Sequence, residues 1–135
     1  MERYHILIAD DDRSILTLAQ KLLEAQGVST ISCRDGQEAI EYLQVCRFDL
    51  IVTDESMPRK NGSELAVWLR DNSNLKDVPL LLMSGEPADK AIKELLQVGT
   101  ITGFIAKPFQ CRNFVSRIYR LLRDAREVKR TKQGI

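Results

Sequence analysis

Short apolar runs rich in β-branched residues recur along the chain and alternate with amphipathic segments of helical length. The runs are His5–Ala9, Val28–Cys33, Asp49–Thr53, Pro79–Ser84 and Gly103–Ala106. This alternation is typical of βαβ units, in which helices join parallel strands. Because such crossovers are right-handed, the pattern predicts an α/β fold with a doubly wound, five-stranded parallel sheet and five helices.

The segments between and after these runs carry apolar residues at helical spacing. The predicted helices are Ser14–Gln26, a segment capped by Asp35, Gly62–Leu69, Pro87–Val98 and a last helix that starts near Cys111. Gly27 is a natural stop after the first helix, and Pro87 is expected in the first turn of the fourth. In such folds the chemistry is expected at the carboxyl ends of the strands.

A length of 135 residues with 44% hydrophobic and 29% charged residues suits one globular domain. We expect this domain to span residues 1–128, followed by a flexible basic tail over 129–135. No apolar run approaches the roughly 20 residues that cross a bilayer, and no signal peptide is evident, so a cytoplasmic location without membrane contact is expected. Cys33, Cys46 and Cys111 fit neither a disulfide framework nor a zinc site and are predicted to be reduced, mostly buried thiols.

Charged or hydroxyl side chains lie at, or directly after, the carboxyl ends of four of the predicted strands. Asp10 and Asp11 follow the first strand, Asp54 the third, and Lys107 the fifth, while Ser84 ends the fourth. Because the carboxyl ends of parallel strands share one edge of a sheet, these residues are expected to converge.

Three carboxylates at this edge would repel one another by a few kcal/mol per pair, which favours a counterion. A hard divalent cation such as Mg²⁺ suits oxygen ligands of this kind. An aspartate can also act as a nucleophile toward phosphorus, and phosphoryl transfer requires mainly positioning and charge neutralisation. The residues therefore indicate phosphoryl transfer to Asp54, with Lys107 and Ser84 binding phosphoryl oxygens.

With these residues in order, the chain resembles the receiver domains of bacterial two-component response regulators, which have a flavodoxin-like (βα)5 fold. The resemblance covers roughly Tyr4 to Leu122. The matching motifs are Asp10-Asp11, Asp54 with Met57-Pro58 and Gly62, Ser84-Gly85, and Lys107-Pro108-Phe109.

This resemblance implies that Asp54 accepts a phosphoryl group from a phosphohistidine on a sensor histidine kinase or histidine phosphotransfer protein, in a reaction that needs Mg²⁺ or Mn²⁺. It implies that Asp11, Asp54 and the backbone carbonyl of Ser56 hold the metal, with Asp10 bound through water. Ser56 and Glu86 occupy the positions that tune the lifetime of the phosphate. The Lys107–Pro108 peptide is cis in the family.

The resemblance also implies a switch in which Ser84 turns toward the phosphoryl group and Phe104, a position that is often Tyr in the family, moves inward. The surface formed by the fourth helix, fifth strand and fifth helix would then change and contact a downstream protein effector. Such a protein is expected as a monomer or a phosphorylation-dependent dimer, and to catalyse its own phosphorylation and dephosphorylation rather than act as a conventional turnover enzyme.

Two alternatives remain open at this stage. One is a receiver-like scaffold that works without phosphorylation. The other is an aspartyl-nucleophile phosphatase of the haloacid-dehalogenase type. Such enzymes have a general-acid Asp two residues after the nucleophile, where this chain has Ser56. His5, the only histidine, lies at the opposite end of the first strand and is expected to be structural, which argues against Ser-His-Asp catalysis. Asp12 is expected to cap the first helix.

Charge is unevenly distributed along the chain. Residues 1–109 hold 12 Lys/Arg and 17 Asp/Glu, whereas residues 110–135 hold 8 Lys/Arg and 2 Asp/Glu. The last helix could present a solvated basic face, meet an acidic partner, or begin a connector to an effector domain. Nucleic-acid binding is not expected, because the basic residues lack interleaved aromatic side chains and a recognisable motif.

Overall fold

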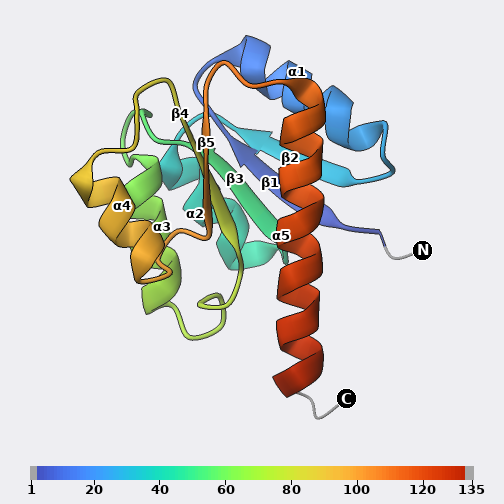
Figure 1. Cartoon of the computed structure of the whole chain (residues 1–135), viewed down its shortest axis with the longest axis vertical. Coiled ribbons are helices and arrows are strands. Elements are labelled where there is room, and N and C mark those ends of the chain that lie inside the picture. The colour runs from blue at the N-terminus through green and yellow to red at the C-terminus, as the bar shows by residue number, and fades with distance from the viewer. Residues whose placement is uncertain (1–2, 133–135) are drawn as a thin grey trace.

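The computed structural model describes residues 3–132, and its centre is a single parallel sheet with the strand order β2-β1-β3-β4-β5 (Figure 1). The strands are β1 (His5–Ala9), β2 (Ser29–Cys33), β3 (Leu50–Asp54), β4 (Leu80–Ser84) and β5 (Gly103–Ala106). The predicted doubly wound α/β fold is therefore confirmed. Three predicted strands began one residue too early, because Val28, Asp49 and Pro79 precede their strands.

Helices cover both faces of the sheet (Figure 1). They are α1 (Arg13–Glu24), α2 (Gly36–Val45), α3 (Gly62–Asp71), α4 (Lys90–Gln97) and α5 (Cys111–Lys132). Successive strand residues point to opposite faces. In β1, Leu7 packs in the core under α2, α3 and α4, whereas Ile6 and Ile8 pack in the core under α1 and α5. β1, β3, β4 and β5 thus each contribute to two separate apolar layers, whereas β2 contributes only to the layer beneath α2, α3 and α4.

Side-chain caps set where the helices begin. Asp12 accepts a hydrogen bond from the Ser14 amide at 2.9 Å, and Asp35 accepts one from Glu38 at 2.8 Å, which confirms both predicted caps. Asp89 accepts from the Ile92 amide at 2.9 Å, so α4 begins at Lys90. The prediction that Pro87 lies in the first turn of this helix was wrong, because the cap follows it.

The last helix is longer than the sheet that it covers, and its final turns run past the strands (Figure 1). Phe114, Ile118, Leu121 and Leu122 are buried against the sheet, but residues 123–132 are exposed apart from the half-buried Ala125. The helix continues to Lys132, so the predicted boundary at residue 128 falls inside α5. The remaining part of the predicted tail, residues 133–135, lies outside the described residues.

The three cysteines differ in exposure. All are free thiols; Cys33 is buried, Cys46 is half-buried and Cys111 is exposed, so the expectation of mostly buried thiols was wrong for Cys111. The His5 ring lies against Phe48, with ring centroids 4.5 Å apart, which supports its structural role. No helix within residues 3–132 is both long and apolar enough to cross a membrane.

Candidate functional site

Four neighbouring strands deliver the predicted site residues to one edge of the sheet. Asp10 directly follows β1, Asp54 is the last residue of β3, Ser84 the last of β4, and Lys107 directly follows β5. Because β1 pairs with β3, β3 with β4 and β4 with β5, all four residues lie at adjacent strand ends. The expected convergence is therefore present in the fold.

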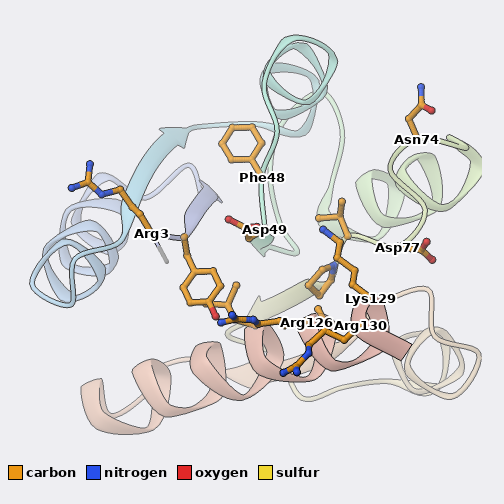
Figure 2. Close-up of a pocket in the computed structure, with 13 residues that line it drawn as sticks. Arg3, Phe48, Asp49, Asn74, Asp77, Arg126, Lys129 and Arg130 are labelled. Carbon is orange, nitrogen blue, oxygen red and sulfur yellow. The ribbon is translucent and has the colours of Figure 1, made fainter. Parts of the chain in front are cut away.

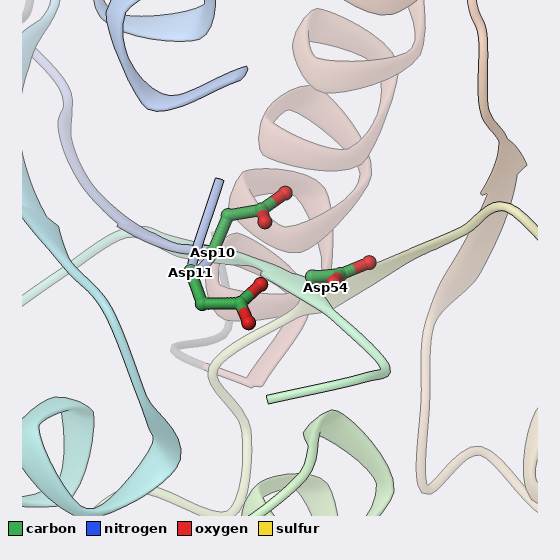
Figure 3. A group of neighbouring side chains, drawn as sticks. All are labelled: Asp10, Asp11 and Asp54. Carbon is green, nitrogen blue, oxygen red and sulfur yellow. The ribbon is translucent and has the colours of Figure 1, made fainter. Parts of the chain in front are cut away.

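Three carboxylates form a cluster at this edge. Asp10, Asp11 and Asp54 each offer one oxygen, and these oxygens lie within 4.8 Å of one another (Figure 3). Asp10 is fully buried and Asp54 is only 6% exposed, whereas Asp11 is exposed. The cluster thus has a buried side, at Asp10 and Asp54, and a side open to solvent, at Asp11.

A single lysine neutralises part of this charge. Lys107 Nζ lies 2.7 Å from Asp10 Oδ2 and 3.0 Å from Asp54 Oδ1. Its backbone amide donates to the Ser84 carbonyl at 2.8 Å, and its peptide bond to Pro108 is cis. Burial acts to lower the pKa of Lys107, but its hydrogen bonds to Asp10 and Asp54 outweigh burial and raise the pKa, so the amine stays charged.

The environment of Asp54 disfavours its ionised form. Burial raises the pKa of this carboxyl above its ordinary value, the hydrogen bond from Lys107 opposes the shift, and the charges of Asp10 and Asp11 add to it. One lysine therefore does not balance three carboxylates. The site has an excess of negative charge that a cation would relieve.

The chain after Asp54 forms a loop that returns closely to its own start. The Gly62 amide donates to the Glu55 carbonyl at 3.0 Å, and the Ser63 hydroxyl donates to the Glu55 carboxylate at 2.8 Å. A Cβ atom at Gly62 would lie 2.5 Å from the Asp54 carbonyl oxygen. Glycine is thus required for this close approach, which holds the peptide of Asp54 in place.

The tip of the same loop is tied to the start of α2. Arg59, at φ 66°, places Nε and a terminal guanidinium nitrogen each 3.0 Å from Asp35 Oδ2. The Gly36 amide donates to the Lys60 carbonyl at 3.0 Å. From the sequence, Asp35 was identified only as a helix cap and Arg59 was missed. The two residues are far apart in sequence, and nothing in the residues around either one indicates that they pair.

The remaining predicted residues surround the cluster. Ser84 is 9% exposed, and its hydroxyl accepts the Glu86 amide at 3.0 Å. Ser56 and Glu86 are exposed in the loops after β3 and β4. Phe104 lies in β5, pairs with Leu82 of β4, and is half-buried against the core beneath α2, α3 and α4.

The donor set of the cluster fits a hard divalent cation. Three carboxylate groups supply oxygen ligands at one solvent-accessible point, which suits Mg²⁺ rather than a metal that prefers nitrogen or sulfur. Among residues 3–132 no other group of three acidic, histidine or cysteine side chains converges in this way.

Comparison with known proteins assigns this arrangement to a class. Residues 6–119 match the family described as response regulator receiver domain. The polar-differentiation response regulator DivK of Brucella anthropi is 32% identical over 120 residues, which cover 89% of this chain and 97% of that protein.

Solved structures agree with the sequence match. The chemotaxis response regulator CheY4 of Vibrio cholerae superposes with a TM-score of 0.82 at 30% identity, covering 89% of this chain and 99% of that one. A signal receiver domain of a histidine kinase from Syntrophus aciditrophicus gives a TM-score of 0.80 at 30% identity, covering 90% and 91%.

A five-stranded α/β domain with a carboxylate cluster and a lysine at its strand ends is the architecture of a signal receiver. The chain belongs to the response regulator receiver domain family of two-component signalling, in which phosphorylation on an aspartate is typical. Membership implies interaction with a histidine kinase or a phosphotransfer partner.

Proposed function

We propose that Asp54 is the aspartate that accepts the phosphoryl group. The observation that carries this proposal is the position of its carboxylate, which ends β3 with Lys107 Nζ 3.0 Å from Oδ1 and with Asp10 and Asp11 beside it. Asp10 is fully buried and ion-paired with Lys107 at 2.7 Å, so it is poorly placed to receive an incoming group. Asp54 combines a nucleophilic oxygen with nearby charge to balance the product.

In the proposed reaction, an Asp54 carboxylate oxygen forms a bond to phosphorus. The bond between phosphorus and a histidine nitrogen of the donor breaks, and that nitrogen keeps the electron pair and takes up a proton. Lys107 Nζ neutralises charge on the transferred group, and the Ser84 hydroxyl turns from the Glu86 amide to donate to a phosphoryl oxygen. The product is an acyl phosphate on Asp54.

Asp10, Asp11, Asp54 and the backbone carbonyl of Ser56 would hold Mg²⁺, or Mn²⁺ in its place, with Asp10 bound through water. The metal supplies positive charge for the phosphoryl oxygens and relieves the repulsion within the carboxylate cluster. The protein's part is to keep these oxygens together, and the closed loop between Glu55 and Gly62 serves this purpose.

A switch is proposed to follow phosphorylation. When Ser84 turns toward the phosphoryl group, space opens beside β5, and Phe104 moves inward from its half-buried position. The surface of α4, β5 and α5 changes as a result and contacts a downstream effector. The protein is proposed to act as a monomer or as a phosphorylation-dependent dimer. Ser56 and Glu86, exposed in loops flanking the site, tune how long the acyl phosphate survives.

The chain is proposed to catalyse its own phosphorylation and hydrolysis without turning over a substrate pool. Incubation with acetyl phosphate and Mg²⁺ tests this by intact-mass spectrometry. We expect addition of a single phosphoryl group, its loss in Asp54→Asn, and its retention in the control Asp71→Asn, which makes the same chemical change at an exposed position at the end of α3. Modification of Asp54→Asn to the same extent, or no modification of the wild type, would contradict the proposal. Steady release of phosphate far above the protein concentration would indicate a phosphatase instead.

A further inference from the structure

A groove of about 610 Å³ lies beneath the last turns of α5 (Figure 2). Its lining includes Tyr4, Asp49 and Pro79, which directly precede β1, β3 and β4. The groove therefore opens at the amino ends of the strands, on the edge opposite the carboxylate cluster. Its volume is within the range of sites that bind ligands or side chains of a partner.

The apolar part of the lining, called the floor of the groove here, consists of Tyr4, Phe48, Val78, Pro79, Leu122 and Ala125. Asp49 lies among these residues (Figure 2). The inward face of α5 carries Ile118, Leu122, Ala125 and then Lys129, so no large apolar side chain follows Leu122 on that face. The helix consequently passes over the groove without filling it.

The rim of the groove is basic. Arg126, Lys129 and Arg130 come from α5; Arg3 comes from the segment before β1, and its guanidinium points away from the middle of the groove (Figure 2). Cations near the carboxyl end of a helix are stabilised by the helix dipole. The dipole does not explain why these cations lie beside an apolar floor, nor the presence of Arg3, which lies outside α5.

Carboxylates of this chain leave the basic rim only partly neutralised. Asp49 accepts the His5 amide at 2.8 Å, and Asp77 pairs with Lys132 at 3.2 Å. Arg130 Nη1 lies 4.0 Å from Glu127 Oε1, at the outer limit of an ion pair, and both side chains are more than half exposed. Within the part of the chain that the structure describes, Lys129 has no carboxylate within 4.0 Å. The groove therefore has positive charge available for an anionic partner.

We propose that this groove binds an acidic peptide segment of another protein, with one apolar side chain on the floor and carboxylates against Lys129 and Arg130. Arginine and lysine at the rim pair with carboxylates, and an apolar anchor in a pocket supplies the central contact. Single-stranded nucleic acid would need several exposed aromatic faces, but of the two aromatic residues in the lining Phe48 is 7% exposed and Tyr4 is half-buried. A membrane surface would need large apolar groups on the outer face of α5, where charged residues predominate.

The position of the groove gives the proposal a second consequence. A five-residue strand separates the two edges of the sheet by roughly 16 Å. The groove is formed by the last turns of α5, from Leu122 onward, and lies at the opposite edge from Asp54. We therefore expect peptide affinity to be the same with and without the phosphoryl group. The groove would act as a constant tether to an acidic partner while the phosphorylation site is switched.

Fluorescence anisotropy with the full chain tests this. The probe is a short fluorescein-labelled peptide of glutamate and aspartate with one central leucine. Lys129→Glu combined with Arg130→Glu should weaken binding by about tenfold or more. The matched control is Arg112→Glu with Arg120→Glu, which makes the same charge change on exposed positions of α5 outside the groove and should weaken binding less than about twofold.

Several outcomes would overturn the proposal. The first is no peptide binding at low ionic strength. The second is an equal loss of peptide affinity in the two double variants. The third is equal affinity for the leucine peptide and for a peptide with serine in place of leucine. Tighter binding of a single-stranded oligonucleotide or of anionic vesicles would assign the groove to another partner. Equal affinity of the wild type before and after incubation with acetyl phosphate and Mg²⁺ supports the tether, and a change in affinity contradicts it. Binding by Asp54→Asn is measured without phosphate donor, so this result is separate from the test of phosphorylation.

Discussion

Lys107 Nζ lies 3.0 Å from Asp54 Oδ1, which places a charged amine beside the carboxylate at the end of β3. The same amine reaches the fully buried Asp10 at 2.7 Å. Lys107 is thus held at the site before any phosphoryl group arrives. Preorganised charge of this kind is what phosphoryl transfer requires of a protein.

Removal of the lysine is expected to slow phosphorylation. Lys107→Ala should lower the rate of modification by acetyl phosphate by about 100-fold, because a positioned donor to the phosphoryl oxygens is lost. Intact-mass time courses measure the rate, and isothermal titration should show that Mg²⁺ binding is retained. Lys21→Ala, at an exposed position of α1, is the control and should react like the wild type. A normal rate in Lys107→Ala would refute this role.

The raised pKa of Asp54 predicts how stability depends on pH in the absence of metal. Between the unfolded pKa of an aspartate, about 3.9, and its higher folded value, the folded protein binds more protons than the unfolded chain. Stability therefore falls as pH rises through this window. Asp54→Asn should melt a few degrees above the wild type at neutral pH, and this advantage should disappear as pH falls to about 4. Thermal unfolding followed by circular dichroism, in chelator, measures both values; a lower melting temperature at pH 7 would be inconsistent with this account.

The Arg59–Asp35 pair predicts an effect on metal binding from outside the cluster. Because Arg59 fixes the loop that contains Ser56, Arg59→Ala should weaken Mg²⁺ binding on the order of tenfold. Arg59→Gly should weaken it equally but retain more stability, since glycine tolerates the φ of 66° at this position. Titration calorimetry gives the affinity, and Arg47→Ala, which is exposed elsewhere, serves as the control. Wild-type affinity in both Arg59 variants would show that the loop is held without this pair.

We expect a glycine-to-alanine substitution to destabilise the protein at Gly62 and to be tolerated at Gly85. Gly62→Ala should lower the free energy of unfolding by about 2 kcal/mol, because its Cβ would lie 2.5 Å from the Asp54 carbonyl oxygen. Gly85→Ala should change it by less than about 0.5 kcal/mol, since nothing lies within 4 Å of that Cβ. Urea unfolding monitored by Trp68 fluorescence compares them, and equal stability of the two variants would argue against the close approach at Gly62.

Local patterns were sufficient to predict the sheet and the convergence of Asp10, Asp11, Asp54 and Lys107 at one of its edges. Apolar runs alternate with helical periodicity throughout the chain, and polar residues at the ends of parallel strands must meet. The start of α4 was missed because Pro87 also suits a first helical turn, and only the structure shows that Asp89 forms the cap. In that case two local signals competed.

Contacts between distant segments could not be predicted in the same way. The Arg59–Asp35 pair and the groove beneath α5 depend on how separate loops and helices are placed in three dimensions. The sequence showed an excess of basic residues at the carboxyl end, but the groove and its apolar floor appear only when α5 lies against the segments that precede β1, β3 and β4.

The most direct test of the central claim is to locate the phosphoryl group. Reduction of the phosphorylated protein with borohydride converts an aspartyl phosphate to homoserine, which tandem mass spectrometry can assign to one residue. The account predicts homoserine at position 54 and unmodified residues at Asp10 and Asp11. Homoserine at either of those two positions, with Asp54 intact, would contradict it.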